Sequence, residues 1–291
     1  MAAPAYIAPL LTEAIRTLTP ASFAKFGDGE IICVYGTLTR MLQLSCQAPA
    51  LPPVGRMNCD HDDYYVPEKA IGLVHAIKYM TEDSSTSFCG LWDNAQKHAP
   101  FWQQFVKAPI RWANYHSIII EKEDLVLQNE VLKDKIELYR TIQQSKRTKV
   151  MICNRLLAKA EPLLQIDYMH YVPTSNWFAE IRTYVKTITE YLKEKGDEYP
   201  IVLTMAGMGA KVILYELMKA YPKGVFIDIG SGLDILCTKR RSRDNGTYYE
   251  DMRAAFAPIL PLIWDDEKYN QLYEEAKQII GVTPYGPITQ A

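Results

Sequence analysis

The segment Ile201-Val202-Leu203-Thr204-Met205-Ala206 runs directly into Gly207-Met208-Gly209-Ala210-Lys211. The first six residues are predicted to form a strand buried on both faces, because apolar side chains occupy its successive positions. The next five are predicted to turn the chain into a helix that runs to Ala220, since small residues permit a sharp corner. A buried strand that passes at once into a helix is typical of a sheet covered by helices.

The same alternation of short apolar strands and amphipathic helices continues along the chain in both directions. Strands are expected at residues 21–26, 87–91, 117–120, 149–153, 168–172, 201–206 and 225–229. Helices are expected at residues 6–18, 31–44, 67–80, 94–106, 123–144, 177–195, 211–220 and 266–280. This pattern predicts an α/β fold, a Rossmann-like domain with a mostly parallel sheet flanked by helices. No Pro-, Gly- or Ser-rich linker divides residues 1–291, so one domain is expected, with its core at about 20–235 and a helical C-terminal extension at 247–291.

The overall composition excludes several classes of protein. The 291 residues are 48% hydrophobic and 23% charged, and the net charge of −2 indicates neither a nucleic-acid nor a membrane partner. No apolar run of membrane-spanning length occurs, and residues 1–18 are not expected to be a signal peptide. The six cysteines include no Cys-x-x-Cys pair, which argues against a zinc site and favours reduced thiols in a cytoplasmic protein.

Three glycine-containing corners follow predicted strands, namely Gly27–Glu30, Gly207–Lys211 and Asp228–Asp234. Ligands of parallel α/β sheets bind beyond the carboxyl ends of the strands. We therefore expect all three corners to contribute to one pocket.

The first corner, Phe26-Gly27-Asp28-Gly29-Glu30, places two carboxylates one residue apart. Asp28 and Glu30 are candidate ligands of Mg²⁺ or Mn²⁺, which are often held by few carboxylates together with substrate phosphates. Gly27 and Gly29 let a ligand come close to the backbone. The alternative is a turn with two solvated acids.

Two other segments are suited to an anionic ligand. The corner Gly207-Met208-Gly209-Ala210-Lys211 opens a helix, and N–H groups at a helix N-terminus attract phosphate. It is neither a Walker A loop nor a full Gly-x-Gly-x-x-Gly motif, and a plain tight turn is the alternative. In the basic run Lys239–Arg243, Arg240 is a candidate contact to a diphosphate, with a solvated loop as the alternative.

Further candidate ligand contacts lie in two other stretches. Asn58-Cys59-Asp60-His61-Asp62-Asp63-Tyr64-Tyr65 gathers acids, an imidazole and aromatic rings before a helix expected to begin at Pro67. Asp60 and His61 can face a pocket, or an acid here can simply cap that helix. Tyr64 and Trp177 can stack on a ligand or belong to the core, and Asn176 directly precedes Trp177.

The strand end Phe226-Ile227-Asp228-Ile229-Gly230-Ser231-Gly232 resembles the cofactor loop of S-adenosylmethionine-dependent methyltransferases. In those enzymes the loop follows the first strand, whereas too few residues follow Asp234 here to build the remaining sheet. A methyltransferase that uses the Asp228–Gly232 loop is therefore kept as an alternative function.

The segment Ser22-Phe23-Ala24-Lys25-Phe26-Gly27-Asp28-Gly29-Glu30 resembles the opening motif of the GT-D fold glycosyltransferases. Three later segments resemble the second half of that family, namely Pro173–Trp177, Val202–Ala210 and Phe226–Gly230. The stretch Asn58–His61 followed by Tyr64 is similar to a segment of some relatives. The resemblance spans about residues 20–235, most of the chain.

The resemblance implies a metal-dependent glycosyltransferase that moves a sugar from a nucleotide-diphosphate sugar, with UDP favoured, to a hydroxyl of a glycan or glycoconjugate. By position, Asp28 and Glu30 would bind Mn²⁺ or Mg²⁺ on the donor diphosphate. Asp228 or Asp234 is expected at the floor of the pocket, and Tyr64, Asn176 and Trp177 are the candidate acceptor contacts. Lys25, which stands where the family usually has Arg, would belong to the donor site. Ser231-Gly232 stands where relatives often have His, so the catalytic base is left open among Asp234, Asp60 and His61. A non-catalytic module that binds sugar nucleotides is the third hypothesis.

Overall fold

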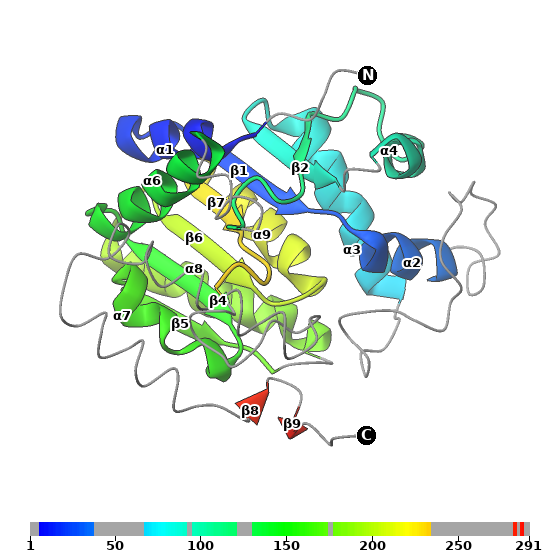
Figure 1. The fold of residues 1–291 in the computed structure, drawn as a ribbon. Coiled ribbons are helices and arrows are strands. Elements are labelled where there is room, and N and C mark those ends of the chain that lie inside the picture. Colours follow the sequence, from blue (N-terminus) through cyan, green and yellow to red (C-terminus); the bar gives the residue numbers. More distant parts are fainter. Residues whose placement is uncertain are drawn as a thin grey trace.

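Seven strands form the central sheet of the computed structural model, which describes residues 6–37, 67–91, 95–120, 130–173, 177–233, 282–283 and 286–287. They are β1 (Ala21–Lys25), β2 (Ser87–Leu91), β3 (Trp112–Asn114), β4 (Lys149–Cys153), β5 (Tyr168–Tyr171), β6 (Ile201–Met205) and β7 (Val225–Asp228). The order across the sheet is β3-β2-β1-β7-β6-β4-β5, and every neighbouring pair is parallel (Figure 1). The predicted α/β fold is confirmed, and this sheet is parallel throughout rather than mostly parallel. Two short strands, β8 (Val282–Thr283) and β9 (Gly286–Pro287), form a separate antiparallel pair.

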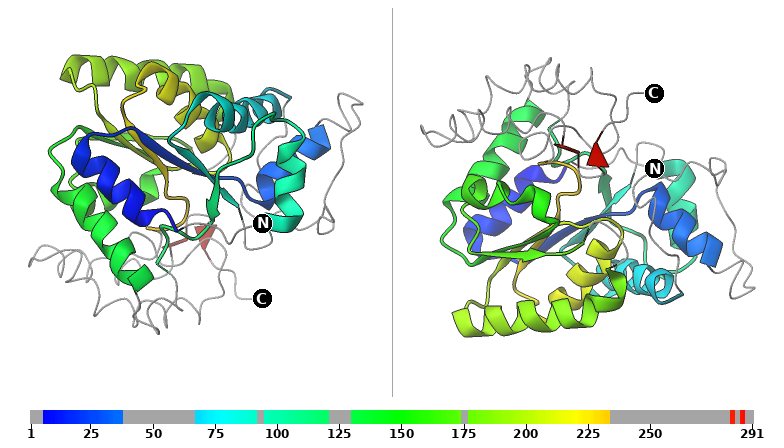
Figure 2. Two further views of the ribbon diagram at one scale, coloured as in Figure 1. Left: turned by 90° about the horizontal axis from the view of Figure 1, so that it is seen from above. Right: turned by 90° about the horizontal axis from the view of Figure 1, so that it is seen from below.

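Helices cover both faces of the seven-stranded sheet (Figure 2). One face carries α1 (Ala8–Thr17), α6 (Glu130–Gln144) and α7 (Ala160–Leu164). The other carries α3 (Pro67–Lys78), α8 (Ile181–Lys195) and α9 (Gly209–Ala220). Two more helices, α2 (Asp28–Gly36) and α4 (Ala95–Gln103), pack against each other near the end of β1. Short helical turns occupy Tyr79–Asp83, Arg155–Leu157 and Phe178–Glu180.

Apolar side chains on the strands explain this three-layer arrangement. In β4, Met151 and Cys153 belong to the core beneath α1 and α6, whereas Val150 and Ile152 belong to the core beneath α8 and α9. Successive side chains of a strand point to opposite faces, so a strand that is apolar at every position must be covered twice. Burial of both faces is therefore what the short apolar strands require.

The three corners expected from the sequence follow adjacent strands. β7 lies between β1 and β6, and its Phe226 is in register with Ser22 on one side and Val202 on the other. Because all three strands are parallel, their carboxyl ends reach the same edge of the sheet (Figure 1). The three corners therefore meet at this edge in the described part of the chain, and the pocket expected there stays a prediction.

One predicted strand is wrong. Residues 117–120 form successive turns, in which the N–H of Ser117 donates to the carbonyl of Asn114 and that of Ile119 to the carbonyl of His116. The strand lies just upstream, at Trp112–Asn114. Ile118, Ile119 and Ile120 are nevertheless buried. Their β-branched side chains fill the core from a turn, so burial rather than strand pairing accounts for this apolar run.

Other predicted boundaries are only partly covered by the described residues. Residues 38–44, 123–129 and 266–280 of the expected helices lie outside them. The predicted end of the α8 segment at Gly196 is confirmed, since Gly196 has φ +66° and forms the left-handed C-cap of the helix.

None of the helices in the described segments has the length and apolar character needed to cross a membrane. Within the same segments Cys33, Cys89 and Cys153 are free, buried thiols.

His170 sits on β5, the edge strand farthest from the three corners in the sheet order β7-β6-β4-β5. His170 is 9% exposed. Its Nδ1 lies 3.3 Å from the hydroxyl of Tyr168, and its ring contacts the ring of Tyr184 edge-on. Among the described residues, its Nε2 has no hydrogen-bond partner. Burial lowers the pKa of His170 below its ordinary value, because the charged imidazolium would lose its hydration.

We expect His170 to make the fold less stable in acid. The unfolded chain takes up a proton at His170 near pH 6.5, whereas the folded chain stays neutral there until a lower pH. Stability contributed by this difference is fully present above the unfolded pKa and is lost as the pH falls towards the folded pKa, by up to about 1.4 kcal/mol per pH unit. Denaturant unfolding of the wild type and His170→Gln at about pH 7.5 and about pH 5.5 measures it. The loss should be smaller in His170→Gln, and His75→Gln, at an exposed position, is the control. Equal losses in the wild type and His170→Gln would contradict the expectation.

Candidate functional site

The first corner is shaped by the start of α2. The N–H of Gly27 donates to Oε2 of Glu30 (2.8 Å), so the side chain of Glu30 folds back onto the beginning of its own helix. Asp28 is half-buried, and its Oδ1 accepts the N–H of Gly29 at 3.0 Å. Both acids lie in the first turn of α2, where the helix dipole favours negative charge. Glu30 thus points inward, and Asp28 is the more exposed of the two.

Lys211 joins all three corners. Its Nζ lies 2.8 Å from Oε1 of Glu30 and 3.1 Å from Oδ2 of Asp228, and it donates to the carbonyl of Gly207 at 3.2 Å. Burial alone would lower the pKa of Lys211, but the charges of Asp228 and Glu30, the nearby Tyr115 and the hydrogen bond to Glu30 together raise it. Lys211 is therefore a buried ammonium held by one group from each corner.

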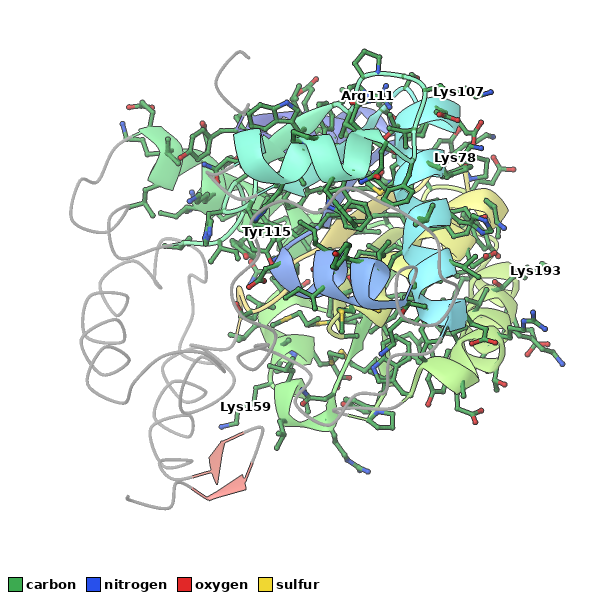
Figure 3. All side chains as sticks on the ribbon, turned by 90° about the vertical axis from the view of Figure 1, so that its right-hand side faces the viewer. Lys78, Lys107, Arg111, Tyr115, Lys159 and Lys193 are labelled. Carbon is green, nitrogen blue, oxygen red and sulfur yellow. The ribbon has the colours of Figure 1, made fainter. Side chains whose placement is uncertain are left out.

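Asp228 holds the end of β7 against the end of β1. Its Oδ2 accepts the N–H of Lys25 and its Oδ1 accepts the N–H of Gly230, both at 3.1 Å. The Nζ of Lys25 donates to the carbonyl of Ile229 at 2.7 Å and lies 5.2 Å from the ring centre of Tyr115 (labelled in Figure 3). Lys25, Lys211, Glu30 and Asp228 are therefore joined by hydrogen bonds and ion pairs where β1, β6 and β7 end.

The second corner combines an open turn with close packing. Gly207 is exposed and has φ +62°, a left-handed conformation that glycine adopts without strain. No side chain caps the N-terminus of α9. Gly209 lies against the indole of Trp177, where a Cβ would approach Cη2 to 2.6 Å. The N–H groups of Ala210 and Lys211 donate to the carbonyls of Gly207 and Met208. The corner thus combines a helix start that no side chain caps with an exposed glycine, a setting that phosphate binding uses.

The described residues contain only part of the predicted site. Lys25, Gly27, Asp28, Gly29, Glu30, Gly207, Gly209, Lys211 and Asp228 are brought together at the three corners. Trp177 is 5% exposed and packs on Gly209, so its ring belongs to the core beside the site rather than to an open surface. The remaining candidates lie outside the described residues, namely Asp60, His61, Tyr64, Asn176, Asp234 and Arg240.

Sequence reasoning missed two residues that the corner network uses. Tyr115 follows β3 and reaches Lys25 with its ring, and it came from the segment whose strand was placed too late. Gly230 has φ +60°, and a Cβ there would lie 2.6 Å from Cε of Lys25. In the sequence, Gly230 belongs to the third corner and to two family resemblances, but nothing there predicts a contact for it. No local pattern links either residue to Lys25, because both contacts arise from strand order.

The donor atoms at the first corner fit a divalent cation in part. Oδ1 of Asp28 accepts a single backbone hydrogen bond, whereas both oxygens of Glu30 contact Gly27 or Lys211. Among the described residues no group of three or more His, Cys, Asp or Glu side chains could hold a metal. Mg²⁺ usually keeps waters and binds through one or two carboxylates and substrate phosphates. Asp28 alone therefore fits a metal that is held jointly with a phosphate ligand.

Comparisons of the chain with protein-family models, curated proteins and solved structures found no match. A Rossmann-like sheet supports many unrelated reactions, so the fold by itself does not choose among them. Function has to be argued from the residues at the three corners.

Proposed function

We propose that this chain is a metal-dependent glycosyltransferase that transfers a sugar from a nucleotide-diphosphate sugar to a hydroxyl of a glycan or glycoconjugate. The observation that carries the proposal is the meeting of the Asp28 corner and the uncapped start of α9 at the carboxyl edge of β1, β7 and β6. A carboxylate and a phosphate-receiving helix end on one edge are what a metal–diphosphate ligand requires. The resemblance of Ser22–Glu30 to the GT-D opening motif supports the same reaction, with UDP as the favoured nucleotide.

Each described residue at the corners has a role in this proposal. Asp28 holds Mn²⁺ or Mg²⁺, which when bound would neutralise charge on the diphosphate leaving group. The positive end of the α9 dipole attracts phosphate oxygens, and Gly207 lets them approach the backbone. Lys25 and Asp228 fix the ends of β1 and β7 so that these groups keep their spacing. The acceptor hydroxyl needs a base within hydrogen-bond reach, for which Asp234, Asp60 and His61 stay predictions.

Substitution of Asp28 tests the proposal most directly. Asp28→Asn should weaken Mn²⁺-dependent binding of UDP or a UDP-sugar at least about a hundredfold, because loss of even an outer-shell partner of a metal costs 10–100-fold. Titration calorimetry with Mn²⁺ present measures the affinity, and circular dichroism checks that the fold is retained. Asp83→Asn, at an exposed position ahead of β2, is the matched control and should bind as the wild type. Equal affinities of wild type and Asp28→Asn would sink the proposal.

A melting-temperature screen separates this function from its alternatives. Stabilisation by a nucleotide-sugar only with Mn²⁺ or Mg²⁺ supports the glycosyltransferase. Stabilisation by S-adenosylhomocysteine, with none from UDP plus Mn²⁺, would instead identify the methyltransferase. Tight sugar-nucleotide binding without hydrolysis or transfer across a broad acceptor panel would identify a non-catalytic module. In the structure Asp228 is 1% exposed and its carboxylate is occupied by protein groups, which disfavours a cofactor contact at that residue.

A further inference from the structure

The ammonium of Lys211 occupies the position between two buried carboxylates. The side chains of Lys211, Glu30 and Asp228 are 6%, 8% and 1% exposed, and the ammonium lies within 3.1 Å of an oxygen of each acid. It also donates to the carbonyl of Gly207. A position lined by two carboxylates and a carbonyl would suit a divalent cation if the ammonium were absent.

The charges at this point are already balanced by the protein. Lys25 and Lys211 supply two positive charges, and Glu30 and Asp228 supply two negative ones. A divalent ion placed between Glu30 and Asp228 would lie within a few ångströms of the ammonium of Lys211, and like charges repel strongly where water is excluded. Oε2 of Glu30 also accepts a hydrogen bond from the N–H of Gly27. Among the acids at the described corners, only Asp28 is left half-buried and outside this set.

We propose that Lys211 is a built-in cation that takes the place of a divalent ion between Glu30 and Asp228, so that the catalytic metal binds at Asp28 only together with the donor diphosphate. This inference rests on the proposed function and adds the order in which its ligands bind. One carboxylate would hold Mn²⁺ weakly by itself, and the phosphates of the nucleotide would supply the further oxygen ligands that Mn²⁺ needs. Lys211 is thus a positioning residue that couples metal binding to donor binding.

Mn²⁺ affinity measured with and without UDP tests the proposal. The wild type should bind Mn²⁺ weakly alone and at least about tenfold more tightly with saturating UDP, as read from the electron paramagnetic resonance signal of free Mn²⁺. In Lys211→Met the two buried acids lose their cation, so Mn²⁺ alone should bind at least about tenfold more tightly than to the wild type. Mn²⁺ alone should also raise the melting temperature of Lys211→Met more than that of the wild type.

Two further variants serve as controls. Lys211→Arg keeps the positive charge and should show the wild-type dependence of Mn²⁺ binding on UDP. The triple variant Glu30→Gln, Lys211→Met, Asp228→Asn removes both acids and should gain no Mn²⁺ binding. Should Lys211→Met fail to fold without metal, its recovery by Mn²⁺ supports the proposal, and if it folds under neither condition the wild-type measurement decides.

The inference and the proposed function fail in different ways. Tight Mn²⁺ binding by the wild type without UDP, or no gain of Mn²⁺ binding by folded Lys211→Met, overturns the role of Lys211. Absence of UDP binding in every variant, with or without Mn²⁺, overturns the proposed function instead. In that case a gain of Mn²⁺ binding by Lys211→Met would still establish Lys211 as the cation of the corner.

Discussion

Replacement of Asp228 by Ala should cost about 3–5 kcal/mol of the free energy of unfolding. Asp228 is 1% exposed and accepts hydrogen bonds from the N–H groups of Lys25 and Gly230 while it pairs with Lys211. Without it, the buried N–H of Lys25 and the half-buried N–H of Gly230 lose their acceptor, and the Lys211 ammonium keeps only one of its two carboxylates. An uncompensated buried charge is what makes such a substitution severe, whereas the intact pair itself stabilises little.

An exposed ion pair provides the control for Asp228. Glu198 contacts Lys223 at 2.6 Å, but the two side chains are 67% and 51% exposed, so Glu198→Ala should cost less than about 1 kcal/mol. Urea unfolding of wild type, Asp228→Ala and Glu198→Ala gives the three free energies at one pH. A loss in Asp228→Ala no greater than that in Glu198→Ala would show that the corner network does not hold the fold together.

The sheet and its corners were predictable from sequence because short, mainly apolar strands alternate with helices, and three of these strands, β1, β6 and β7, run into glycine-containing corners. Runs such as Ile201–Met205 can bury their side chains only in a sheet that helices cover on both faces. The glycines that follow such a run mark where the chain turns. The adjacency of the three corners followed from the general rule for parallel sheets. The apolar run Ile118–Ile120 misled because burial without strand pairing produces the same pattern.

The partners of the charged residues were not predictable in the same way. Lys211 was expected to face an anionic donor, yet in the structure it faces Glu30 and Asp228. Glu30 lies 181 positions earlier in the chain, and only the order β1-β7-β6 brings it to Lys211. Local sequence shows that a charged residue is present but not which residue of opposite charge pairs with it, because pairing depends on strand order.

Charge pairing also changes how the two acids of the first corner compare. By spacing alone, Asp28 and Glu30 are equivalent candidates for a metal. In the fold, Glu30 is fixed at both oxygens, whereas Asp28 is half-buried with a backbone contact to Gly29. Glu30 is therefore the acid of this corner that belongs to the buried network, and Asp28 is the one for which we propose a ligand. The Asp28 substitution tests the proposed ligand role, and the Asp228 substitution tests the network that Asp228 and Glu30 share through Lys211.

Replacement of Gly230 by Ala should cost about 3 kcal/mol or more of the free energy of unfolding. Gly230 has φ +60°, which costs a residue with a Cβ about 1–2 kcal/mol. Its new Cβ would also lie 2.6 Å from Cε of Lys25 and still closer to its Nζ. Lys25 is 2% exposed and bound to the carbonyl of Ile229, so it cannot move aside without losing a charged hydrogen bond worth about 1.5–3 kcal/mol.

The variant Gly196→Ala is the control that separates the backbone cost from the steric cost of Gly230→Ala. Gly196 has φ +66°, and a Cβ there would meet nothing within 4 Å, so Gly196→Ala should show only the backbone cost of about 1–2 kcal/mol. Adding Lys25→Ala to Gly230→Ala removes the obstructing side chain, so the double variant should be more stable than the sum of the single losses implies, by about 0.5–3 kcal/mol. Urea unfolding of these variants measures both differences. If Gly230→Ala and Gly196→Ala lose the same free energy and the double variant is additive, the contact between Lys25 and the backbone of Gly230 does not constrain the corner.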